Sequence, residues 1–385
     1  MGSLGTPYRS DIKVTPLPLP SGSSIDFGAT VEEIDIENLS DADFEKLNDS
    51  LYNYNVLILK GQGHTTPKAQ YLLTQRFDPA AGSGYGHNAD FRDKKSILAN
   101  DGSTIPAVPQ VQLIGNGRFG SYEGLENFKL THPHHQTFHR TVVPKEEDPV
   151  YTRFYRWHID AALYNKLPPR VTTFIAVRLP KDGASRRQTI RWDDGTGDEV
   201  KGIVPGSTAF VSSYKTYDLL SEDQKEFARG AKIEYAPHPY VWMASAKARE
   251  NGLGMHNEGL EAPDDQLPPI EKDKILITPM CWRNPVTGKL ALQIHPASVK
   301  KIHKPNGEIL DDLAEVRKIL YEYQRPGIGP EYVYLHEWKE GDMVVWNNHG
   351  MLHAVTGTLD PDKEQDKRLF RQCNLAASAP PLGPL

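Results

Sequence analysis

The sequence predicts a mainly β protein in which a few helices flank a sandwich or barrel of short strands. From about residue 95 onward, short apolar runs recur along the chain, and each is bounded by Gly, Pro or Asn. Only a few segments show apolar residues at helical spacing. No internal repeat, low-complexity block or linker interrupts the middle of the chain. These observations favour one large β domain buttressed by helices.

Composition narrows the class of protein. The chain has 385 residues, of which 38% are hydrophobic and 24% are charged, as is typical of a soluble globular protein. A formal charge of −6, without a basic block, argues against a nucleic-acid partner. No apolar run approaches the length of a membrane span, so we expect no membrane partner. Two cysteines make no disulfide framework, which favours a cytoplasmic location. A homo-oligomer remains compatible with the sequence.

The N-terminal elements can be expected in order. Residues 1–25 are rich in Pro, Ser and Gly and predict a flexible arm, and the compact part begins near residue 26. Ser40 is a candidate N-cap, followed by acidic residues in a first helical turn. Residues 56–60 predict a short buried strand, and residues 71–77 a second helix.

The rest of the chain predicts strands with two further helices. We expect helices at 221–230 and 309–324 and strands at 108–114, 152–157, 171–179, 208–213, 275–279, 290–294 and 342–346. Residues 181–205 are polar and Gly-rich, which indicates a surface insertion with a hairpin turn, and residues 246–272 predict a mobile excursion. A single domain would thus span residues 26–378, followed by a flexible tail at 379–385.

A His-x-Asp pair, His158 and Asp160, ends the aromatic strand-like run at 152–157. Residues i and i+2 of a strand point to the same side, so both side chains could face one metal ion. A third ligand must come from another strand, and His353 follows the run at 342–346, although His349 competes on position alone. Two imidazoles and one carboxylate are the set that holds Fe(II) on one face and leaves three positions open for oxygen chemistry.

A basic strand strengthens this hypothesis. Arg368 begins an alternating run that reaches Asn374. A guanidinium near an iron site can clamp a carboxylate through two parallel hydrogen bonds, as an enzyme that uses a 2-oxoacid requires. The alternative interpretations are ordinary ones: a His-x-Asp pair is common, the chain has 14 histidines, and Arg368 could form a surface ion pair.

At these residues the chain resembles the taurine dioxygenase family of Fe(II)- and 2-oxoglutarate-dependent dioxygenases, over most of its length. Five motifs carry the resemblance: residues 27–31, Trp157-His158-Ile159-Asp160, Gly206-Ser207-Thr208-Ala209-Phe210, residues 283–288, and Leu352-His353 with Arg368 downstream. The resemblance implies a double-stranded β-helix (jelly roll), Fe(II), 2-oxoglutarate as cosubstrate and O2. It also implies that His158, Asp160 and His353 bind the metal, in preference to His349. Arg368 and Thr208 would bind the far carboxylate of 2-oxoglutarate.

One departure bears on the substrate. Gln372 stands where sulfonate-oxidising members have a second arginine, and an amide suits a neutral heterocycle better than a sulfonate. Together with residues 155–164, Gln372 and Asn374 are similar to the fungal xanthine dioxygenases of this family. That resemblance implies that Gln372 and Asn374 face a purine, with help from Gln110 or Gln112 and from Lys129.

The small-molecule partner implied is xanthine, which would be hydroxylated to urate. The alternatives are water-facing polar residues at 372 and 374, another substrate such as a fungal natural product or a small organic acid, and a non-enzymatic jelly-roll binding protein.

Overall fold

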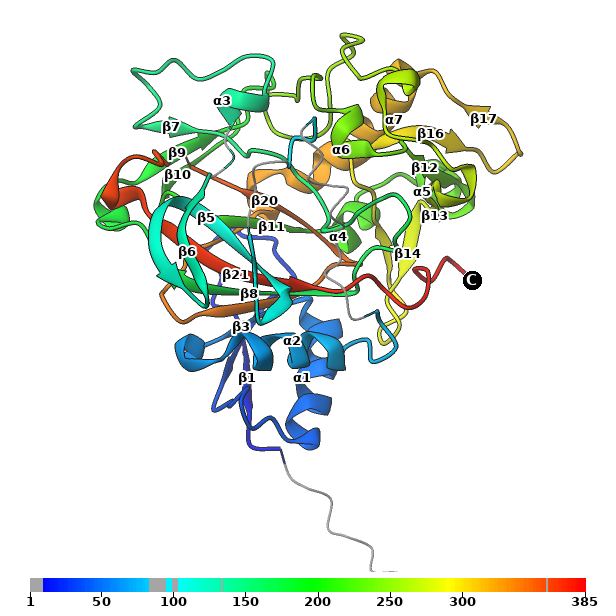
Figure 1. Ribbon diagram of the computed structural model, residues 1–385. Helices are drawn as coiled ribbons and strands as arrows, with labels where there is room; N and C mark the ends of the chain where they lie inside the picture. The colour runs from blue at the N-terminus through cyan, green and yellow to red at the C-terminus, as the bar shows by residue number, and fades with distance from the viewer. Residues whose placement is uncertain (1–9, 83–94, 99–102, 132, 134, 358) are drawn as a thin grey trace, which may run out of the picture.

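The computed structural model describes residues 10–82, 95–98, 103–131, 133, 135–357 and 359–385 (Figure 1). Its strands are β1 (Lys13–Pro16), β2 (Ala29–Glu32), β3 (Val56–Leu59), β4 (Ser103–Ile105), β5 (Val108–Tyr122), β6 (Leu125–Leu130), β7 (Tyr151–Thr152), β8 (Val171–Arg178), β9 (Gln188–Arg191), β10 (Glu199–Ile203), β11 (Thr208–Ser212), β12 (Lys232–Tyr235), β13 (Ile277–Pro279), β14 (Cys281–Arg283), β15 (Leu290–Leu292), β16 (Val299–His303), β17 (Ile309–Leu310), β18 (Tyr334–His336), β19 (Met343–Asn347), β20 (Met351–Val355) and β21 (Arg368–Asn374). Its α-helices are α1 (Asp41–Tyr54), α2 (Pro67–Arg76), α3 (His135–Phe138), α4 (Ser213–Asp218), α5 (Glu222–Gly230), α6 (Pro239–Trp242) and α7 (Leu313–Gln324).

Two sheets enclose the centre of the molecule. The main sheet has the order β1-β2-β3-β19-β8-β21-β5-β4, with β6 added to β5, and all of these pairs are antiparallel except β2 with β3. The smaller sheet has the order β18-β11-β20. Aromatic side chains from both sheets, such as Phe174, Trp346 and Phe370 of the main sheet and Phe210 of the smaller one, form one buried cluster between them. The predicted mainly β architecture with flanking helices is therefore confirmed.

Alternation along β8 shows how the main sheet is covered on both faces. Val171 and Ile175 pack in the cluster that contains Leu47 of α1 and Leu73 of α2. Phe174 and Ala176 point the other way, into the cluster between the sheets. A strand buried on both faces needs apolar residues at both parities, which explains why residues 171–179 read as a continuous apolar run.

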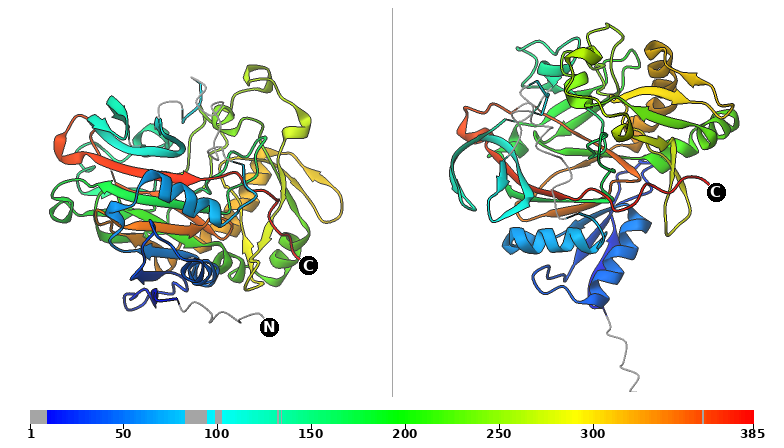
Figure 2. Two further views of the ribbon diagram at one scale, coloured as in Figure 1. Left: turned by 60° about the horizontal axis from the view of Figure 1, so that its bottom comes forward. Right: turned by 45° about the vertical axis from the view of Figure 1, so that its right-hand side comes forward.

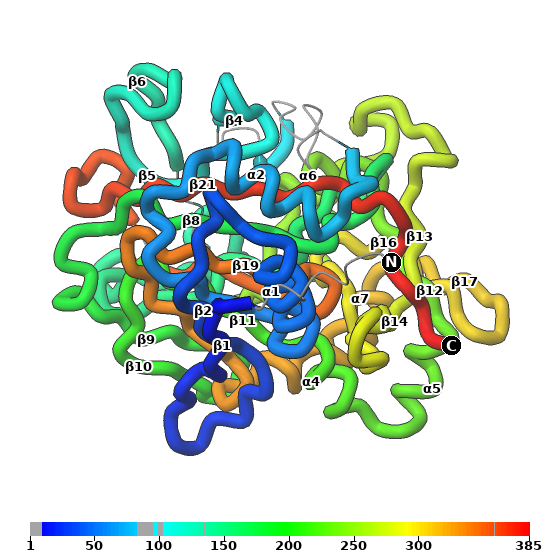
Figure 3. The backbone as a smooth tube through the Cα atoms, turned by 90° about the horizontal axis from the view of Figure 1, so that it is seen from below, coloured from blue at the N-terminus to red at the C-terminus, as the bar shows by residue number. Residues whose placement is uncertain are grey.

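Helices α1 and α2 form an N-terminal layer on the outer face of the main sheet (Figures 1 and 2). Ser40 caps α1 as predicted, since its hydroxyl accepts a hydrogen bond from the Asp43 backbone N–H at 3.1 Å. Thr66 caps α2 in the same way, ahead of Pro67 at the first helical position. From below, the two helices lie across β8, β19 and β21 (Figure 3).

The smaller sheet is covered by a second layer. Helices α5 and α7 and the sheet β13-β12-β16-β17 supply side chains to the largest buried cluster, together with the residues of β11 and β20 that face away from the main sheet. Helix α7 begins at Leu313 after its N-cap Asp312. The predicted helix at 309–324 is therefore too long at its start, because Ile309 and Leu310 pair with β16 instead.

The structure also differs from several predicted strand limits. The strand expected at 152–157 shrinks to Tyr151–Thr152, and residues 153–160 form only single bridges to neighbouring strands. The strand expected at 108–114 continues to Tyr122, since its second half pairs with β6. Those expected at 275–279 and 290–294 are trimmed to β13 and β15.

Both chain ends differ from the flexible segments that the sequence suggested. Residues 13–16 form the first strand of the main sheet, and Ile12 is buried beneath α1, so pairing with β2 and one buried side chain anchor this part of the arm. Residues 1–9 lie outside the described residues. At the other end, Pro381 is buried and the Arg283 backbone N–H donates to the Leu382 carbonyl at 2.7 Å.

The two predicted excursions pack against the body of the protein, the first through polar contacts and the second through buried apolar side chains. Residues 181–205 contain the expected hairpin, β9 with β10, which also pairs with β7. Asp194 at its tip forms an ion pair with Arg325 at 2.5 Å; burial alone would raise the pKa of Asp194, but this pairing holds it well below its usual range. Within 246–272, Leu253 and Met255 are buried. No helix in the described ranges is long and apolar enough to cross a bilayer.

Candidate metal centre and active site

His158, Asp160 and His353 meet at one end of the space between the two sheets. Ligand atoms of the three side chains all lie within 4.8 Å of one another, and within the described chain they are the group that could hold a metal ion. The two imidazole rings are 4.1 Å apart, and His353 Nε2 lies 3.6 Å from Asp160 Oδ1. The structure thus brings His353 to a His-x-Asp pair that lies nearly 200 positions earlier in the sequence.

The backbone fixes the separation of the two histidines. The His158 N–H donates to the His353 carbonyl and the His353 N–H donates to the His158 carbonyl, both at 3.0 Å. His353 lies within β20, which pairs with β11, and not just after the strand at 343–346 as the sequence suggested. His349, the alternative on position, instead bonds through Nε2 to the Pro168 carbonyl at 3.0 Å.

Asp160 is oriented by hydrogen bonds rather than by strand alternation, which corrects the reasoning from the His-x-Asp spacing. Its backbone N–H donates to Asn348 Oδ1 at 2.9 Å, and Asn348 Nδ2 donates to its carbonyl at 2.7 Å. Its Oδ2 accepts from the Thr172 hydroxyl at 2.7 Å and from Gln372 Nε2 at 3.3 Å. Oδ1 is therefore the oxygen that faces the histidines.

The protonation of His158 suits a metal ligand. Burial and the neighbouring His353 lower its pKa well below the usual value, so the ring is neutral at pH 7. Its Nδ1 lies 2.9 Å from the Arg156 carbonyl, which can only accept, so Nδ1 carries the proton and Nε2 keeps a free electron pair. A buried carboxylate oxygen beside the neutral His158 imidazole and the His353 ring is a donor set that fits a divalent metal.

Arg368 is a buried cation without a counter-ion. Its side chain is 2% exposed, its guanidinium carbon lies 4.0 Å from the centre of the Phe370 ring, and no carboxylate in the described chain pairs with it. Its Nε has no hydrogen-bond partner, and burial lowers its pKa to about 9. A guanidinium in this state is stabilised when a carboxylate enters beside it.

The segment that leads to Thr208 lies against Arg368. A Cβ at Gly206, where φ is +85°, would come within 3.4 Å of the Arg368 side chain, so glycine permits this close approach. Thr208 is buried, and its hydroxyl oxygen accepts a hydrogen bond from Trp338 Nε1 at 3.0 Å. The hydroxyl proton of Thr208 therefore remains available for another acceptor.

The substrate-binding candidates lie on neighbouring strands. Gln372 and Asn374 share the face of β21 that carries Phe370, and Asn374 is fully buried with both amide atoms unbonded. Gln112 is buried and is the Cα partner of Gln372 across the β5–β21 pair, whereas Gln110 is half-buried on the same strand. An orphaned buried amide indicates a polar ligand in contact with it.

Lys129 has a different environment. It lies on β6 with 37% of its side chain exposed, and its amino group is 3.8 Å from the exposed carboxylate of Asp362. Its role toward a substrate remains a prediction.

Several residues around the triad were missed by reasoning from the sequence. Thr172 and Asn348 orient Asp160, as described above. His295 is fully buried, its ring centre is 6.3 Å from that of His158, and its Nε2 has no partner. Arg156 directly precedes the motif and is also buried. Only Arg156 carried a signal, a charged residue inside an aromatic run, that could have singled it out.

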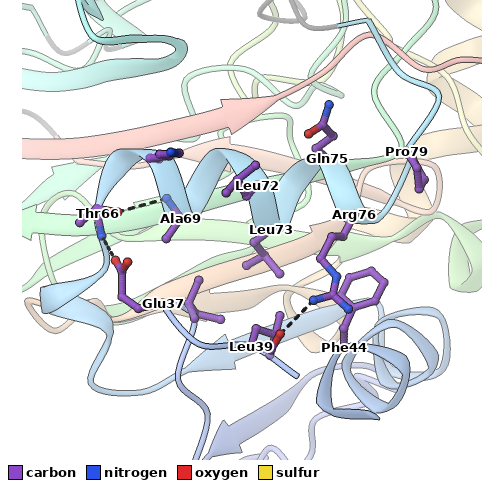
Figure 4. A pocket seen from close by; sticks show the side chains of 12 residues that line it. Glu37, Leu39, Phe44, Thr66, Ala69, Leu72, Leu73, Gln75, Arg76 and Pro79 are labelled. Atoms are coloured by element: carbon purple, nitrogen blue, oxygen red, sulfur yellow. Dashed lines mark hydrogen bonds between the residues drawn. The ribbon is translucent and has the colours of Figure 1, made fainter. Parts of the chain in front are cut away.

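A hollow of about 900 Å³ elsewhere on the protein is not this site. It lies in the N-terminal layer, lined by residues of α2 such as Leu72 and Arg76 and by the segment before α1, such as Glu37 (Figure 4). Glu37 there accepts from the Thr66 backbone N–H, and Arg76 donates to the Leu39 carbonyl at 3.0 Å. Its charged side chains thus serve the ends of the helices.

Comparison with known proteins identifies the class. The family model described as "Taurine catabolism dioxygenase TauD, TfdA family" matches residues 13–373. The chain therefore belongs to this family and is a dioxygenase, which confirms the resemblance drawn from the motifs.

The more similar relatives are fungal. The chain is 57% identical over 377 residues to the alpha-ketoglutarate-dependent xanthine dioxygenase xan-1 of Neurospora crassa, covering 96% of this chain and 88% of that protein. It is 48% identical over 381 residues to xan1 of Schizosaccharomyces pombe, described in the same words, covering 97% and 90%. Among solved structures, a putative alpha-ketoglutarate-dependent taurine dioxygenase from Burkholderia xenovorans matches with a TM-score of 0.58 at 18% identity, covering 97% and 92%, and shares the fold.

Proposed function

We propose that the protein is an Fe(II)- and 2-oxoglutarate-dependent dioxygenase that hydroxylates xanthine to urate. In this reaction xanthine, 2-oxoglutarate and O2 give urate, succinate and CO2. The observation that carries the proposal is the convergence of His158, Asp160 and His353 in the same inter-sheet space as a buried, unpaired Arg368. Relatives that are 57% and 48% identical bear the same activity in their names.

In the proposed enzyme, Fe(II) is held by Nε2 of both histidines and by Asp160. When bound, the iron supplies the activation of O2. The chain's contribution is to orient the His158 imidazole and the Asp160 carboxylate, through the hydrogen bonds of His158 Nδ1 to the Arg156 carbonyl and of Thr172 to Asp160 Oδ2. These bonds set the ligand atoms before a metal arrives.

2-Oxoglutarate is proposed to place its far carboxylate against Arg368, with the Thr208 hydroxyl as a second donor. The carboxylate would satisfy the unbonded Arg368 Nε and neutralise the buried charge. Trp338 holds the Thr208 oxygen from the other side, so the Thr208 proton is directed away from Trp338.

Xanthine is proposed to bind near Gln372, Asn374 and Gln112. Its ring offers N–H donors and carbonyl acceptors in alternation, and a carboxamide can meet both. Asn374 has both amide atoms free for this purpose. Gln372 already donates to Asp160 Oδ2, so it can link the position of the substrate to that of the metal ligand. Gln110 and Lys129 stay secondary candidates.

We further propose that the two sheets form a double-stranded β-helix of the jelly-roll type in a single domain. The facing arrangement of the main sheet and β18-β11-β20 around one aromatic cluster supports this. A cytoplasmic location is supported by the state of the two cysteines, Cys281 and Cys373, which are both buried and unpaired.

The test is anaerobic titration of the protein with Fe(II) and 2-oxoglutarate, followed by xanthine, with absorption as the readout. We expect a metal-to-ligand band that shifts on addition of xanthine, and urate and succinate in equal amounts after O2 is admitted. Asp160→Ala and His158→Ala should abolish 2-oxoglutarate turnover.

The possible outcomes separate the alternatives. Turnover of 2-oxoglutarate without urate would retain the family chemistry and reject xanthine, and a panel of natural products and small organic acids would then follow. Failure to bind iron or to consume 2-oxoglutarate would favour a binding protein without catalysis.

A further inference from the structure

Two of the buried arginines that the structure describes have neither a carboxylate nor a backbone carbonyl as partner, and only one of them is accounted for by 2-oxoglutarate. Among the described arginines that are 6% exposed or less, Arg153 pairs with Asp193, Arg317 pairs with Glu261, and Arg371 donates to the Thr65 carbonyl. Arg368 and Arg156 have no such partner.

The surroundings of Arg156 do not compensate its charge. The side chain is 4% exposed, its Nε has no hydrogen-bond partner, and its Nη1 contacts only the Met243 sulfur, at 3.8 Å. A thioether sulfur is a weak acceptor. The guanidinium carbon is 5.4 Å, 5.6 Å and 5.9 Å from the ring centres of Tyr240, Tyr155 and Phe138, all near the outer limit of about 6 Å for an attractive contact with an aromatic face. None of these rings carries a charge that would neutralise the guanidinium.

Arg156 shares this part of the site with a second unpartnered polar group. The Tyr240 ring centre lies 6.3 Å from that of His295, and the His295 ring centre lies 6.3 Å from that of His158. His295 Nδ1 is taken by Ser298 Oγ at 3.0 Å, while its buried Nε2 has no partner. Burial lowers the pKa of both His158 and His295, and the nearby charge of Arg156 lowers it further.

The charge balance of the loaded site points to the sign of the missing ligand. Among the described residues, the site brings together one carboxylate, Asp160, and two guanidiniums, Arg156 and Arg368, that have no ion-pair partner. A divalent metal and a dianionic cosubstrate cancel each other, so one positive charge is left over. A buried uncompensated charge is unfavourable, and a monoanionic ligand removes it.

We infer that Arg156, with His295 beside it, is a specificity-determining group that binds the purine as its monoanion. This inference rests on the proposed function. Xanthine loses a proton near neutral pH, and urate is the stronger acid, so substrate and product can both carry the charge. Gln372 and Asn374 then form hydrogen bonds with the neutral edge of the ring, and Arg156 forms an ion pair with the ionised edge.

The experiment compares wild type with Arg156→Met, Arg156→Gln and Arg156→Lys, all loaded anaerobically with Fe(II) and 2-oxoglutarate. Arg156→Met and Arg156→Gln should raise the Kd for xanthine at least tenfold and should raise KM more than they lower kcat. Arg156→Lys should raise the Kd for xanthine severalfold. The affinity for 2-oxoglutarate should change less than that for xanthine. Arg187→Met, which removes a half-exposed partner of Glu337, is the matched control. Its Kd for xanthine should stay within twofold of the wild-type value.

A second measurement isolates charge. Urate should compete with xanthine for the loaded enzyme. Arg156→Met should weaken the binding of the urate anion more than the binding of hypoxanthine, which is uncharged at neutral pH. If the Met and Gln variants do not fold, as judged by their melting curves, the comparison is made with Arg156→Lys.

The inference is overturned if a folded Arg156 variant binds xanthine within twofold of wild type. It is also overturned if Arg156→Met or Arg156→Gln, which remove the charge, weaken the binding of urate and of hypoxanthine equally. Wild-type protein that produces no urate from xanthine would reject the proposed function itself, which is a distinguishable result.

Discussion

Replacing Arg368 by methionine should stabilise the protein in the absence of 2-oxoglutarate. Burial lowers the pKa of this guanidinium from 12.5 to about 9, because the charged form loses its hydration without gaining a carboxylate. At about 1.36 kcal/mol for each tenfold change in acidity, this corresponds to a penalty on the order of 5 kcal/mol. Since the folded-state pKa lies below the unfolded one, the penalty is complete below pH 9 and declines only between pH 9 and 12.5.

Methionine keeps much of the side-chain volume over Phe370 while removing the charge. Replacement of buried ionic groups by apolar ones has stabilised proteins by roughly 1–4 kcal/mol, and we expect a gain in that range. Binding of 2-oxoglutarate should stabilise wild type more than it stabilises Arg368→Met. Bound at about a hundred times its Kd, it stabilises wild type by about 2.7 kcal/mol, whereas Arg368→Met should gain little.

The assay is thermal denaturation of both proteins under anaerobic conditions with Fe(II), with and without 2-oxoglutarate. Without the cosubstrate, Arg368→Met should have a higher melting temperature than wild type. With 2-oxoglutarate, this difference in melting temperature should become smaller or change sign. Arg187→Met controls for loss of an exposed arginine. A variant that melts lower than wild type and still responds fully to 2-oxoglutarate would refute the reasoning.

Three further outcomes are expected. Thr172→Val removes the hydroxyl that donates to Asp160 Oδ2 and should raise the Fe(II) concentration needed for half-maximal turnover by about 10–100-fold, while Thr172→Ser should not. Gln372→Ala should weaken xanthine binding by about 1–3 kcal/mol, and its KM for xanthine should rise more than its KM for the cosubstrate. Burial lowers the pKa of His336 to about 3 and that of His349 to about 4. As the pH falls below 6.5, the two histidines are therefore protonated in the unfolded chain while they remain neutral in the folded chain. Stability should therefore fall as the pH is lowered from 6.5 towards 4, by up to roughly 3 kcal/mol for each histidine, and the melting temperature should fall with it.

Each of these outcomes has a result that contradicts it. Unchanged iron affinity in Thr172→Val would mean that the hydroxyl does not orient the carboxylate. If Gln372→Ala raised the Michaelis constants for xanthine and for the cosubstrate equally, the change would indicate general damage to the site. A melting temperature that does not change between about pH 6.5 and pH 4 would mean that the buried histidines accept protons in the folded state.

The sequence predicts the candidate site better than it predicts the reason for its geometry. His158, Asp160 and His353 were singled out by residue type and motif, and the structure brings them together. The expected cause, two side chains on one face of a strand, is absent, because residues 153–160 make only isolated bridges. Asn348 fixes Asp160 from a turn 188 residues away, and a contact at that separation leaves no periodic signal in the chain.

In the fold too, elements set by local interactions are predicted from the sequence, whereas elements set by tertiary contacts are not. Helix α1 was found from Ser40 and its acidic first turn, because capping is a local interaction. Strand β1 was missed because its four residues, mostly exposed, are ordered by pairing with β2 and not by their own apolar pattern. His295 was missed for a similar reason: a histidine after a short strand is unremarkable until tertiary structure buries its Nε2.

The reciprocal backbone hydrogen bonds between His158 and His353 have a consequence for how the protein acquires its metal. Folding itself sets the distance between the two imidazoles, so the loss of chain entropy that usually accompanies metal capture has already occurred. Divalent ions of similar size should then exchange at this position without reshaping the surrounding strands. Selection among such ions falls to their ligand preferences and their supply in the cell, rather than to a shape that the protein adopts for one of them.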